Sequence, residues 1–225
     1  KALLLDTLGC AVGAWGTAPV KIALKIAGGV RPCEMPATIL GSSRRSSPDL
    51  ATFANGVLIR TLDFNDGFAG RSGGGGHPSD NFAPILACAD ALRVSGKVVL
   101  AASVLAYEVV CRLADRVNLL ALGVDYPVFG VVSATVAAAK ILGLSREQTV
   151  QAINLAVAPN VALRQTRVGE VSLWKGCAMA NAARNAVFAA LLSREGMTGP
   201  SPVFEGRYGL FRSVTGPFDL DEFGG

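Results

Sequence analysis

The sequence predicts an all-α protein, a multi-helix globular domain of six or seven helices with its polar groups gathered in the loops. Apolar residues recur at helical spacing through most of the 225 residues. Start and stop signals, such as Pro127 and Gly143, bound several of these stretches. No internal repeat, heptad register or low-complexity tract interrupts the pattern apart from the glycines at 73–76.

In the N-terminal part, the first helix is predicted over residues 1 to about 15. A connection rich in Gly, Ser and Pro follows over 28–48, with a short strand at 37–40. Asp49 is the expected N-cap of the next helix, whose apolar stripe runs to about Leu62.

Boundary signals place the remaining helices. After a connection over 63–80, one helix begins near Asp80 and ends at the Ser95-Gly96 break, and another covers about 97–117. Three later helices are predicted. The first runs from Pro127 to the stop at Gly143, the second from the capping box Ser145-Arg146-Glu147-Gln148 to about Val157, and the third from Ser172 to about Glu195. The alanines of the last helix permit close approach to its neighbours.

Composition narrows the function classes. Hydrophobic residues make up 51% and charged residues 17%, which argues against intrinsic disorder. The longest stretch without Asp, Glu, Lys or Arg, residues 148–163, is shorter than the roughly 18 residues that a membrane span needs. A net charge of +4 spread along the chain favours a small anionic ligand. We therefore expect no membrane and no nucleic-acid partner.

The cysteines and the first residues bear on location. The five cysteines show no C-x-x-C pairing, and we interpret them as free thiols in a reducing, cytoplasmic setting: Cys10, Cys33, Cys88, Cys111 and Cys177. The first residues lack the cationic region and cleavage site of a secretory signal. Because the chain starts at Lys1 and not at methionine, we expect its natural start to lie upstream.

One loop concentrates candidate chemistry. Its polar residues are Asp63, Asn65, Asp66, Arg71, Ser79, Asp80 and the only histidine, His77. Histidine and aspartate together can transfer protons near neutral pH, because imidazole titrates there and a carboxylate fixes its tautomer. Each residue also has a structural interpretation: Asp63 in a loop after a helix, His77 in a turn before proline, Asp80 as an N-cap. The density of the cluster in so apolar a chain favours function.

The glycine run Gly73–Gly76 in this loop predicts a flexible surface segment; a hinge, or backbone amides that approach an anion, are the alternatives. No Lys-Ser/Thr follows the glycines, so they form no P-loop. One histidine and scattered cysteines give no metal-ligand set, and two carboxylates such as Asp63 and Asp66 are too common in loops to indicate magnesium. We expect no metal site.

A second polar cluster precedes the last predicted helix. Arg164, Arg167 and Lys175 supply three cations there, which suits a carboxylate-bearing substrate. A solvated basic loop is the alternative for the arginines. Lys175 differs because it opens an apolar helix, where desolvation can tune an amine for proton transfer.

Several segments resemble the MmgE/PrpD family, in the same order along nearly the whole chain. They are Asp63-Phe64-Asn65-Asp66, His77-Pro78-Ser79-Asp80-Asn81, Ala106-Tyr107-Glu108-Val109, the stretch 137–145, Leu163-Arg164 with Arg167 and Lys175, and Gly196-Met197-Thr198-Gly199-Pro200. The first two motifs and the arginine-rich segment are closest to the 2-methylcitrate dehydratase branch of this family.

The resemblance implies a helical domain, truncated at both ends in residues 1–225, whose α+β lid domain is absent from this chain. It also implies a homodimer, no metal or organic cofactor, and small polycarboxylate substrates. By motif, the catalytic positions are Asp63, His77 and Lys175. The substrate-binding positions assigned are Asn65, Asp66, Arg71, Ser79, Tyr126, Arg164 and Arg167.

The resulting hypothesis is a hydro-lyase of propionate catabolism in which His77 and Asp63 transfer protons, while Lys175 and one or more arginines bind carboxylates. One alternative keeps the family and changes the reaction, to cis-aconitate decarboxylation or iminodisuccinate epimerisation. Another is a non-catalytic helical subunit that needs a partner lid chain. Tyr126 stands where many members carry a histidine, which weakens the decarboxylase alternative. The loop between Asp63 and His77 is also longer and richer in glycine than the family leads us to expect.

Overall fold

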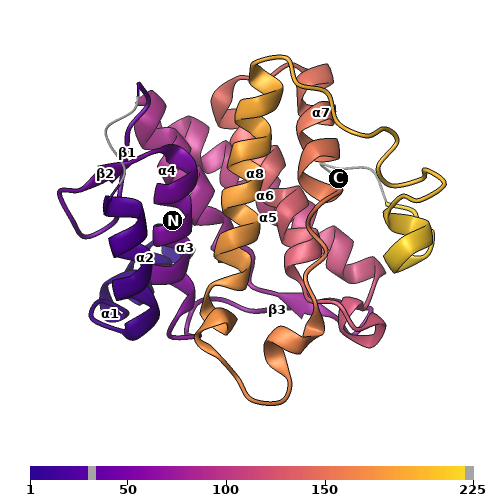
Figure 1. Ribbon diagram of the computed structural model, residues 1–225, viewed down its shortest axis with the longest axis horizontal. Helices are drawn as coiled ribbons and strands as arrows, with labels where there is room; N and C mark the ends of the chain where they lie inside the picture. Colours follow the sequence, from indigo (N-terminus) through magenta and orange to yellow (C-terminus); the bar gives the residue numbers. More distant parts are fainter. Residues whose placement is uncertain (30–33, 221–225) are drawn as a thin grey trace.

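Helices α6 and α8 form the centre of the fold (Figure 1). The computed structural model describes residues 1–29 and 34–220. In it, α8 packs against α3, α6 and α7, and α6 also packs against α4 and α5. The α-helices are α1 (Ala2–Gly13), α2 (Ala18–Gly28), α3 (Pro48–Arg60), α4 (Phe82–Leu92), α5 (Gly96–Arg116), α6 (Pro127–Leu142), α7 (Arg146–Val157) and α8 (Ala178–Arg194).

The predicted all-α class is confirmed. Within the described ranges the only sheets are two antiparallel pairs, β1 (Ala37–Thr38) with β2 (Arg45–Ser46) and β3 (Phe68–Ala69) with β4 (Gly75–Gly76). Short helical turns complete the connections: η1 (Pro78–Asn81), η2 (Leu119–Leu122), η3 (Arg164–Arg167), η4 (Leu173–Gly176) and η5 (Phe211–Thr215). The second of these sheets lies in the loop that was predicted to carry the chemistry.

Small residues bring the central helices together. A Cβ atom on Gly56 of α3 would lie 2.7 Å from the Cβ of Ala180 in α8, and one on Gly130 of α6 would overlap Met179 of α8. The helix axes can therefore approach closely only because these side chains are missing. The prediction that the last helix packs closely on its neighbours is confirmed.

Several predicted boundaries hold and one helix was missed. The capping box at Ser145 is present, with both reciprocal hydrogen bonds, and Gly143 ends α6 in a left-handed conformation. Helix α2 was not predicted, although Val20, Ala23 and Ala27 give it a buried apolar face at helical spacing.

Other boundaries are corrected. Helix α3 begins at Pro48 with Ser47 at its N-cap, so Asp49 lies in its first turn. The Ser95-Gly96 break does not end α4, because Arg93 already caps it in a left-handed conformation and Gly96 opens α5. Helix α8 begins only at Ala178, because the separate turn η4 precedes it.

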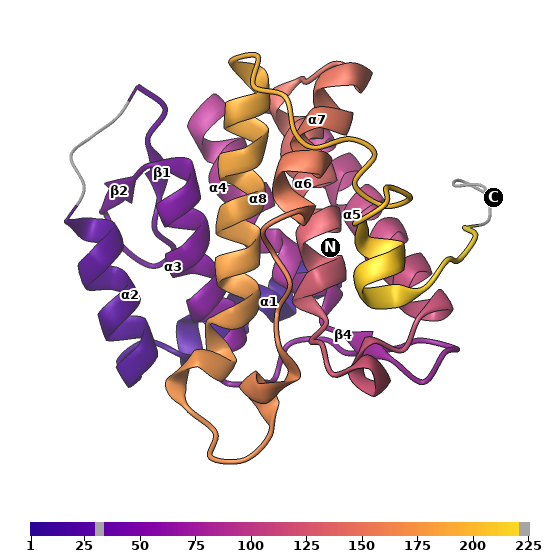
Figure 2. The same cartoon turned by 45° about the vertical axis from the view of Figure 1, so that its right-hand side comes forward.

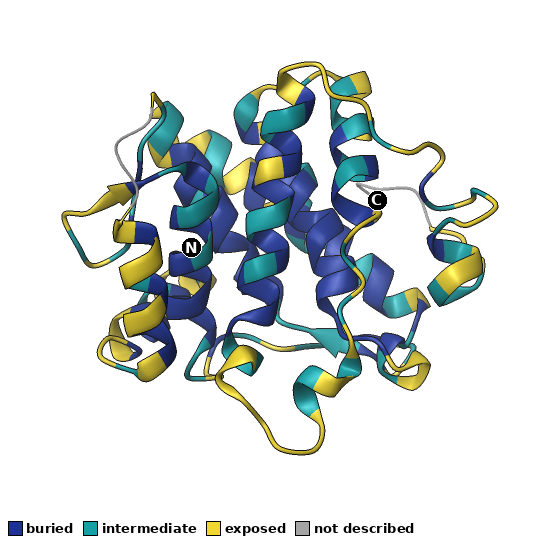
Figure 3. Cartoon of the chain, in the orientation of Figure 1, coloured by how far each residue is buried: buried dark blue, intermediate teal, exposed yellow. Residues whose placement is uncertain are grey.

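Burial follows this arrangement. Buried residues concentrate where α3, α4, α6 and α8 meet, whereas the connection from α7 to α8 is largely exposed (Figure 3). Among the described cysteines, Cys10, Cys88 and Cys177 are buried free thiols and Cys111 is half-buried; Cys33 lies outside the described residues. No single described helix has the length and apolar character to cross a membrane; α1 and α2, bent by 95°, pass that test only as a pair.

Three connections meet at one end of the bundle, at the lower edge of Figures 1 and 2. They join α3 to α4, α5 to α6 and α7 to α8. The last two are tied by backbone hydrogen bonds from Asp125 N to Ala162 O (2.9 Å) and from Arg164 N to Gly123 O (3.0 Å). This end therefore gathers the polar residues of segments far apart in the sequence.

Candidate active site

A hollow of about 590 Å³ opens where the three connections meet. All three predicted catalytic residues line it, namely Asp63, His77 and Lys175. Its other lining residues are Arg60, 67–69, 73–76, Leu120, Asp125, Tyr126, Arg164 and Arg167. The structure thus brings together six of the ten residues predicted for the site, along with two charged residues that were not predicted, Arg60 and Asp125.

Asp63 is held by the cations around it. It follows α3 in a left-handed conformation (φ 60°), which Asp tolerates better than most residues. Its carboxylate accepts a hydrogen bond from Arg60 and lies 3.2 Å from Lys175 Nζ. Partial burial raises the pKa of Asp63, but the hydrogen bonds and charges of Arg60 and Lys175 outweigh it and lower the pKa to about 2. At neutral pH Asp63 is therefore a carboxylate that orients cations and has no proton to donate.

His77 has both ring nitrogens engaged. Nδ1 lies 2.6 Å from the carbonyl oxygen of Asp66, and Nε2 lies 2.8 Å from Nη2 of Arg60. Asp63 Oδ1 is 3.7 Å from the same Nε2. The imidazole ring also packs edge-on against Tyr126, with ring centroids 5.7 Å apart. The ring is thus oriented from three sides, with Nε2 toward the charged groups of the hollow.

Asn65, Asp66 and Ser79 support the loop and do not line the hollow. Asp66 accepts hydrogen bonds from the Ser79 amide (3.0 Å) and from the Tyr107 hydroxyl (2.7 Å). Asn65 Nδ2 donates to Ser79 Oγ and to Asp80 Oδ1, both at 2.9 Å. Polar side chains of a tight loop satisfy one another here, and their assignment to substrate binding stays a prediction.

A buried polar layer lies behind His77. The Tyr126 hydroxyl donates to Asp80 Oδ2 at 2.5 Å and accepts from Nε of Arg60 at 3.3 Å. Burial raises the pKa of Asp80, against the opposing effect of Arg60, and burial followed by the nearby Asp80 raises the pKa of Tyr126. The side chain of Asp80 caps no helix, so the N-cap interpretation of Asp80 is wrong. Tyr126 and Arg60 also line the hollow, so this largely buried layer can hold the groups that face a ligand.

The glycine run is a packing feature. β4 pairs with β3, and a Cβ on Gly75 would overlap the carbonyl oxygen of Phe68. A Cβ on Gly76 would lie 2.8 Å from Cδ2 of Tyr126, and one on Gly74 would lie 3.1 Å from Cα of Asn118. The predicted flexible surface loop is therefore wrong: the glycines let the hairpin press against Tyr126 and the end of α5.

The second polar cluster reaches the hollow from the opposite side. Nε of Arg167 lies 2.9 Å from both carboxylate oxygens of the buried Asp125, and its guanidinium lies 4.9 Å from the centroid of the Tyr126 ring. Arg164 also lines the hollow. Trp174, next to Lys175, is half exposed and lines a neighbouring cleft of about 470 Å³.

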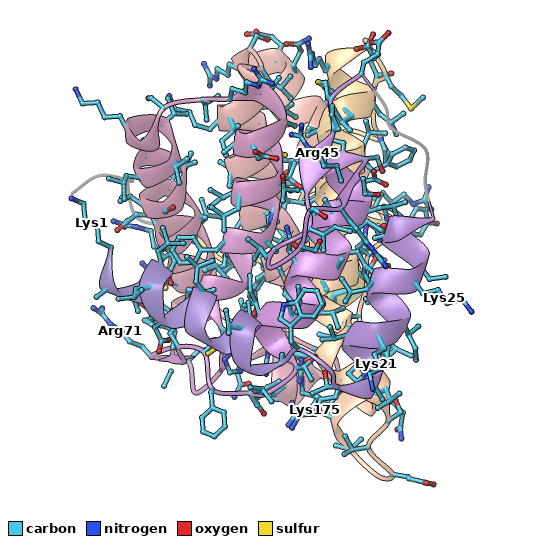
Figure 4. The ribbon with its side chains drawn as sticks, turned by 90° about the vertical axis from the view of Figure 1, so that its left-hand side faces the viewer. Lys1, Lys21, Lys25, Arg45, Arg71 and Lys175 are labelled. Atoms are coloured by element: carbon cyan, nitrogen blue, oxygen red, sulfur yellow. The ribbon has the colours of Figure 1, made fainter. Side chains whose placement is uncertain are left out.

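Arg71 does not line this hollow. Its side chain is 90% exposed and its Nε lies 3.8 Å from Asp115, while its backbone amide donates to the same carboxylate at 2.8 Å. Figure 4 shows Arg71 well separated from Lys175. The hairpin turns Arg71 away from the hollow, and its assignment as a carboxylate-binding residue stays a prediction.

Arg60 is the residue that the sequence patterns did not single out. It ends α3, directly after the buried Val57, Leu58 and Ile59, and its side chain is 4% exposed. A cation that closes an apolar helix, three residues before the loop carboxylate Asp63, was an available signal, because the two side chains can meet across the turn that ends the helix. Burial opposes the charge of Arg60, but Tyr126 and Asp80 raise its pKa, so it remains a cation.

The arrangement is suited to acid–base chemistry on an anion. Arginine and lysine side chains bind carboxylates, and an imidazole beside a carboxylate transfers protons. Among residues 1–29 and 34–220, no three His, Cys, Asp or Glu side chains come together as metal ligands.

The fold and the site define a class of protein: an all-helical domain whose inter-helix loops form a hollow lined by cations and acid–base groups. Comparison with known protein families identifies the family within this class. The MmgE/PrpD N-terminal domain matches residues 1–222, and the chain belongs to this family.

Similar proteins carry related names. The chain is 32% identical over 223 residues to 2-methylcitrate dehydratase of Cupriavidus necator and 33% identical over 227 residues to that of Escherichia coli K12, in both cases over 92% of this chain and 45% of the relative. Alkylcitrate dehydratase phiI of a fungal species is 32% identical over 239 residues, covering 95% of this chain and 45% of the relative. The chain thus spans a little under half the length of these relatives.

Proposed function

We propose that the protein is a cofactor-independent hydro-lyase that dehydrates 2-methylcitrate to 2-methyl-cis-aconitate, a reaction of propionate catabolism. The observation that supports this most is the hollow in which Asp63, His77 and Lys175 converge among arginines. The names of the relatives point to the same substrate class. Because the chain covers under half of those relatives, the activity is proposed for the protein that contains it.

The proposed step balances as an elimination. A base removes a proton from the carbon next to a carboxylate, the carbon–oxygen bond of the hydroxyl breaks, and that hydroxyl leaves as water after it receives a proton, so that a carbon–carbon double bond forms. His77 Nε2 is proposed as the base. Lys175, Arg164 and Arg167 would bind the carboxylates. Asp63 would keep Lys175 and Arg60 in place, a narrower role than the proton transfer expected from the sequence.

Substrate profiling tests this function. The purified protein is incubated with 2-methylcitrate, cis-aconitate and iminodisuccinate, and products are identified by mass spectrometry and chiral chromatography. We expect water loss from 2-methylcitrate; carbon dioxide from cis-aconitate or epimerised iminodisuccinate would replace the proposal by one of the family alternatives. His77→Gln should lower kcat by about a hundredfold or more, and near-normal turnover would remove His77 from the mechanism.

The second candidate function is a helical subunit that needs a partner lid chain. Size-exclusion chromatography and assays of the chain alone, and mixed with candidate lid chains encoded beside it, distinguish the two. Activity only on mixing would favour the partner-dependent subunit. The homodimer and the cytoplasmic location stay predictions, and the same chromatography tests the first of them.

A further inference from the structure

The guanidinium of Arg60 contacts four side chains of the site at once. Nη1 donates to Asp63, Nη2 lies 2.8 Å from Nε2 of His77, and Nε donates to the Tyr126 hydroxyl at 3.3 Å. Nε also lies 3.7 Å from Oδ2 of Asp80. One planar guanidinium therefore joins the groups that line the hollow to the buried layer behind them, which a flexible point charge could not do.

The directions of the hydrogen bonds define the tautomer of His77. The carbonyl oxygen of Asp66 can only accept, so Nδ1 of His77 carries the hydrogen. The guanidinium of Arg60 can only donate, so Nε2 accepts with its lone pair. The neutral imidazole is thus held with its basic nitrogen on the side of the hollow, and both neighbours agree on the same tautomer.

We propose that Arg60 is a positioning residue, which fixes the tautomer and ring orientation of His77 and the orientation of the Asp63 carboxylate. The effect on catalysis rests on the proposed function; the effect on His77 does not. The side chain of Arg60 is only 4% exposed, and its contacts with Tyr126 and Asp80 hold it at the base of the hollow. The low pKa of Asp63, about 2, is consistent with this arrangement.

Arg60 also affects the fate of the proton after His77 has taken it. Nε2 has a single lone pair, so the hydrogen bond from Nη2 must break before Nε2 can take the proton from the substrate carbon; the protonated ring then faces the guanidinium as a second cation. This repulsion favours release of the proton from Nε2 to the departing hydroxyl, which then leaves as water. The same nitrogen can therefore take and return one proton in a single turnover, with no net change in the charge of the site.

Nitrogen NMR tests the positioning without any turnover. His77 is the only histidine, so its two ring nitrogens can be assigned directly in the labelled full-length protein. At mildly alkaline pH we expect a single Nδ1–H tautomer whose Nε2 signal carries the shift of a hydrogen-bond acceptor. In Arg60→Lys the Nε2 signal should move toward that of a free imidazole, while in Arg71→Lys it should stay. An Nε2–H tautomer in the unmodified protein would overturn the proposal.

Kinetics test the catalytic consequence. Arg60→Ala should lower kcat by about a hundredfold, because misplacement of a reacting group costs on that order, with KM changed less than about threefold. Arg60→Lys keeps the charge beside Asp80 and should remain folded, yet lose about tenfold in kcat. Millimolar guanidinium should restore part of the kcat of Arg60→Ala and none of that of His77→Gln.

The outcomes separate the two proposals. A raised KM with unchanged kcat would make Arg60 a substrate-binding residue and overturn the positioning role. The absence of rescue by guanidinium in a folded Arg60→Ala protein would do the same. Absence of dehydratase activity in the unmodified protein would refute the proposed function, while the NMR result would still decide whether Arg60 orients His77.

Discussion

Asp63 and Asp80 lie on opposite sides of the same guanidinium, and their surroundings shift their pKa values in opposite directions. Asp63, at 42% exposure, has a pKa lowered to about 2 by Arg60 and Lys175. Asp80, at 3% exposure, has its pKa raised by burial in spite of Arg60. The difference teaches that one cation does not determine the state of a carboxyl group; solvent access decides whether pairing or desolvation dominates.

Removing each carboxylate in turn is the strongest test of this comparison. Asp80→Ala should lower the free energy of unfolding by about 3–5 kcal/mol, because buried Arg60 loses one of its two carboxylate partners and the buried Tyr126 hydroxyl loses its acceptor. Asp63→Ala should cost less than about 1 kcal/mol, because its ion pairs face solvent. Chemical denaturation measures both. Equal losses would show that the two sides of Arg60 are not energetically distinct.

A substitution in the glycine run can disturb the packing around Tyr126 without removing a charged group. Gly76→Ala places a methyl group against Tyr126 and should cost about 1–3 kcal/mol by overpacking. Gly96→Ala is the matched control, because nothing lies within 4 Å of its added Cβ, and its stability should stay the same or rise. If thermal melting shows equal stability for both variants, the hairpin does not press on Tyr126.

Tyr126→Phe removes one hydroxyl from the buried layer. We expect a loss of about 1–2 kcal/mol, because Asp80 loses a donor and Arg60 loses an acceptor while the ring still packs against His77. Urea denaturation with an unchanged m-value measures this loss. A stability equal to that of the unmodified protein would mean that the hydroxyl contributes nothing to the layer.

The smallest expected effect is on the pH dependence of the free energy of unfolding at acid pH. The folded pKa of Asp63, about 2, lies below its ordinary 3.8, so the unfolded chain takes up the proton first as the pH falls. The stability from Asp63 is complete above about pH 4 and is lost as the pH falls toward about 2. Asp63→Asn should flatten this part of the pH dependence of unfolding. For Asp80 the sign is reversed, because its pKa is raised and its charged form costs stability as the pH rises.

The sequence could predict the helices better than the direction in which loop residues face. Periodicity and caps gave α6, α7 and the Ala-rich α8, because each depends on local spacing. The positions of His77 and Lys175 in one hollow came from motif resemblance, since residues so far apart along the chain carry no local signal of contact. The sequence could not place Arg71 relative to the hollow, because nothing in its neighbours shows which way a hairpin turns its side chains.

Arg60 and the glycine run show what local patterns cannot supply. The side chain of Arg60 is held in place by Tyr126 and Asp80, which belong to other elements of the fold. Gly76 looks like a flexible residue until the Tyr126 ring is placed against it. In both cases the structural role of a residue depends on a partner far along the chain, and only the folded structure shows that partner.

Trp174 gives the site an optical property. The protein holds two tryptophans, and the other, Trp15, packs beside Gly41 at the end of α1. A Trp15→Phe protein would therefore emit from a single indole, the immediate neighbour of Lys175. Its emission would report changes in the cleft that Trp174 lines beside Lys175, so that binding next to the hollow and turnover could be followed as separate signals in one sample.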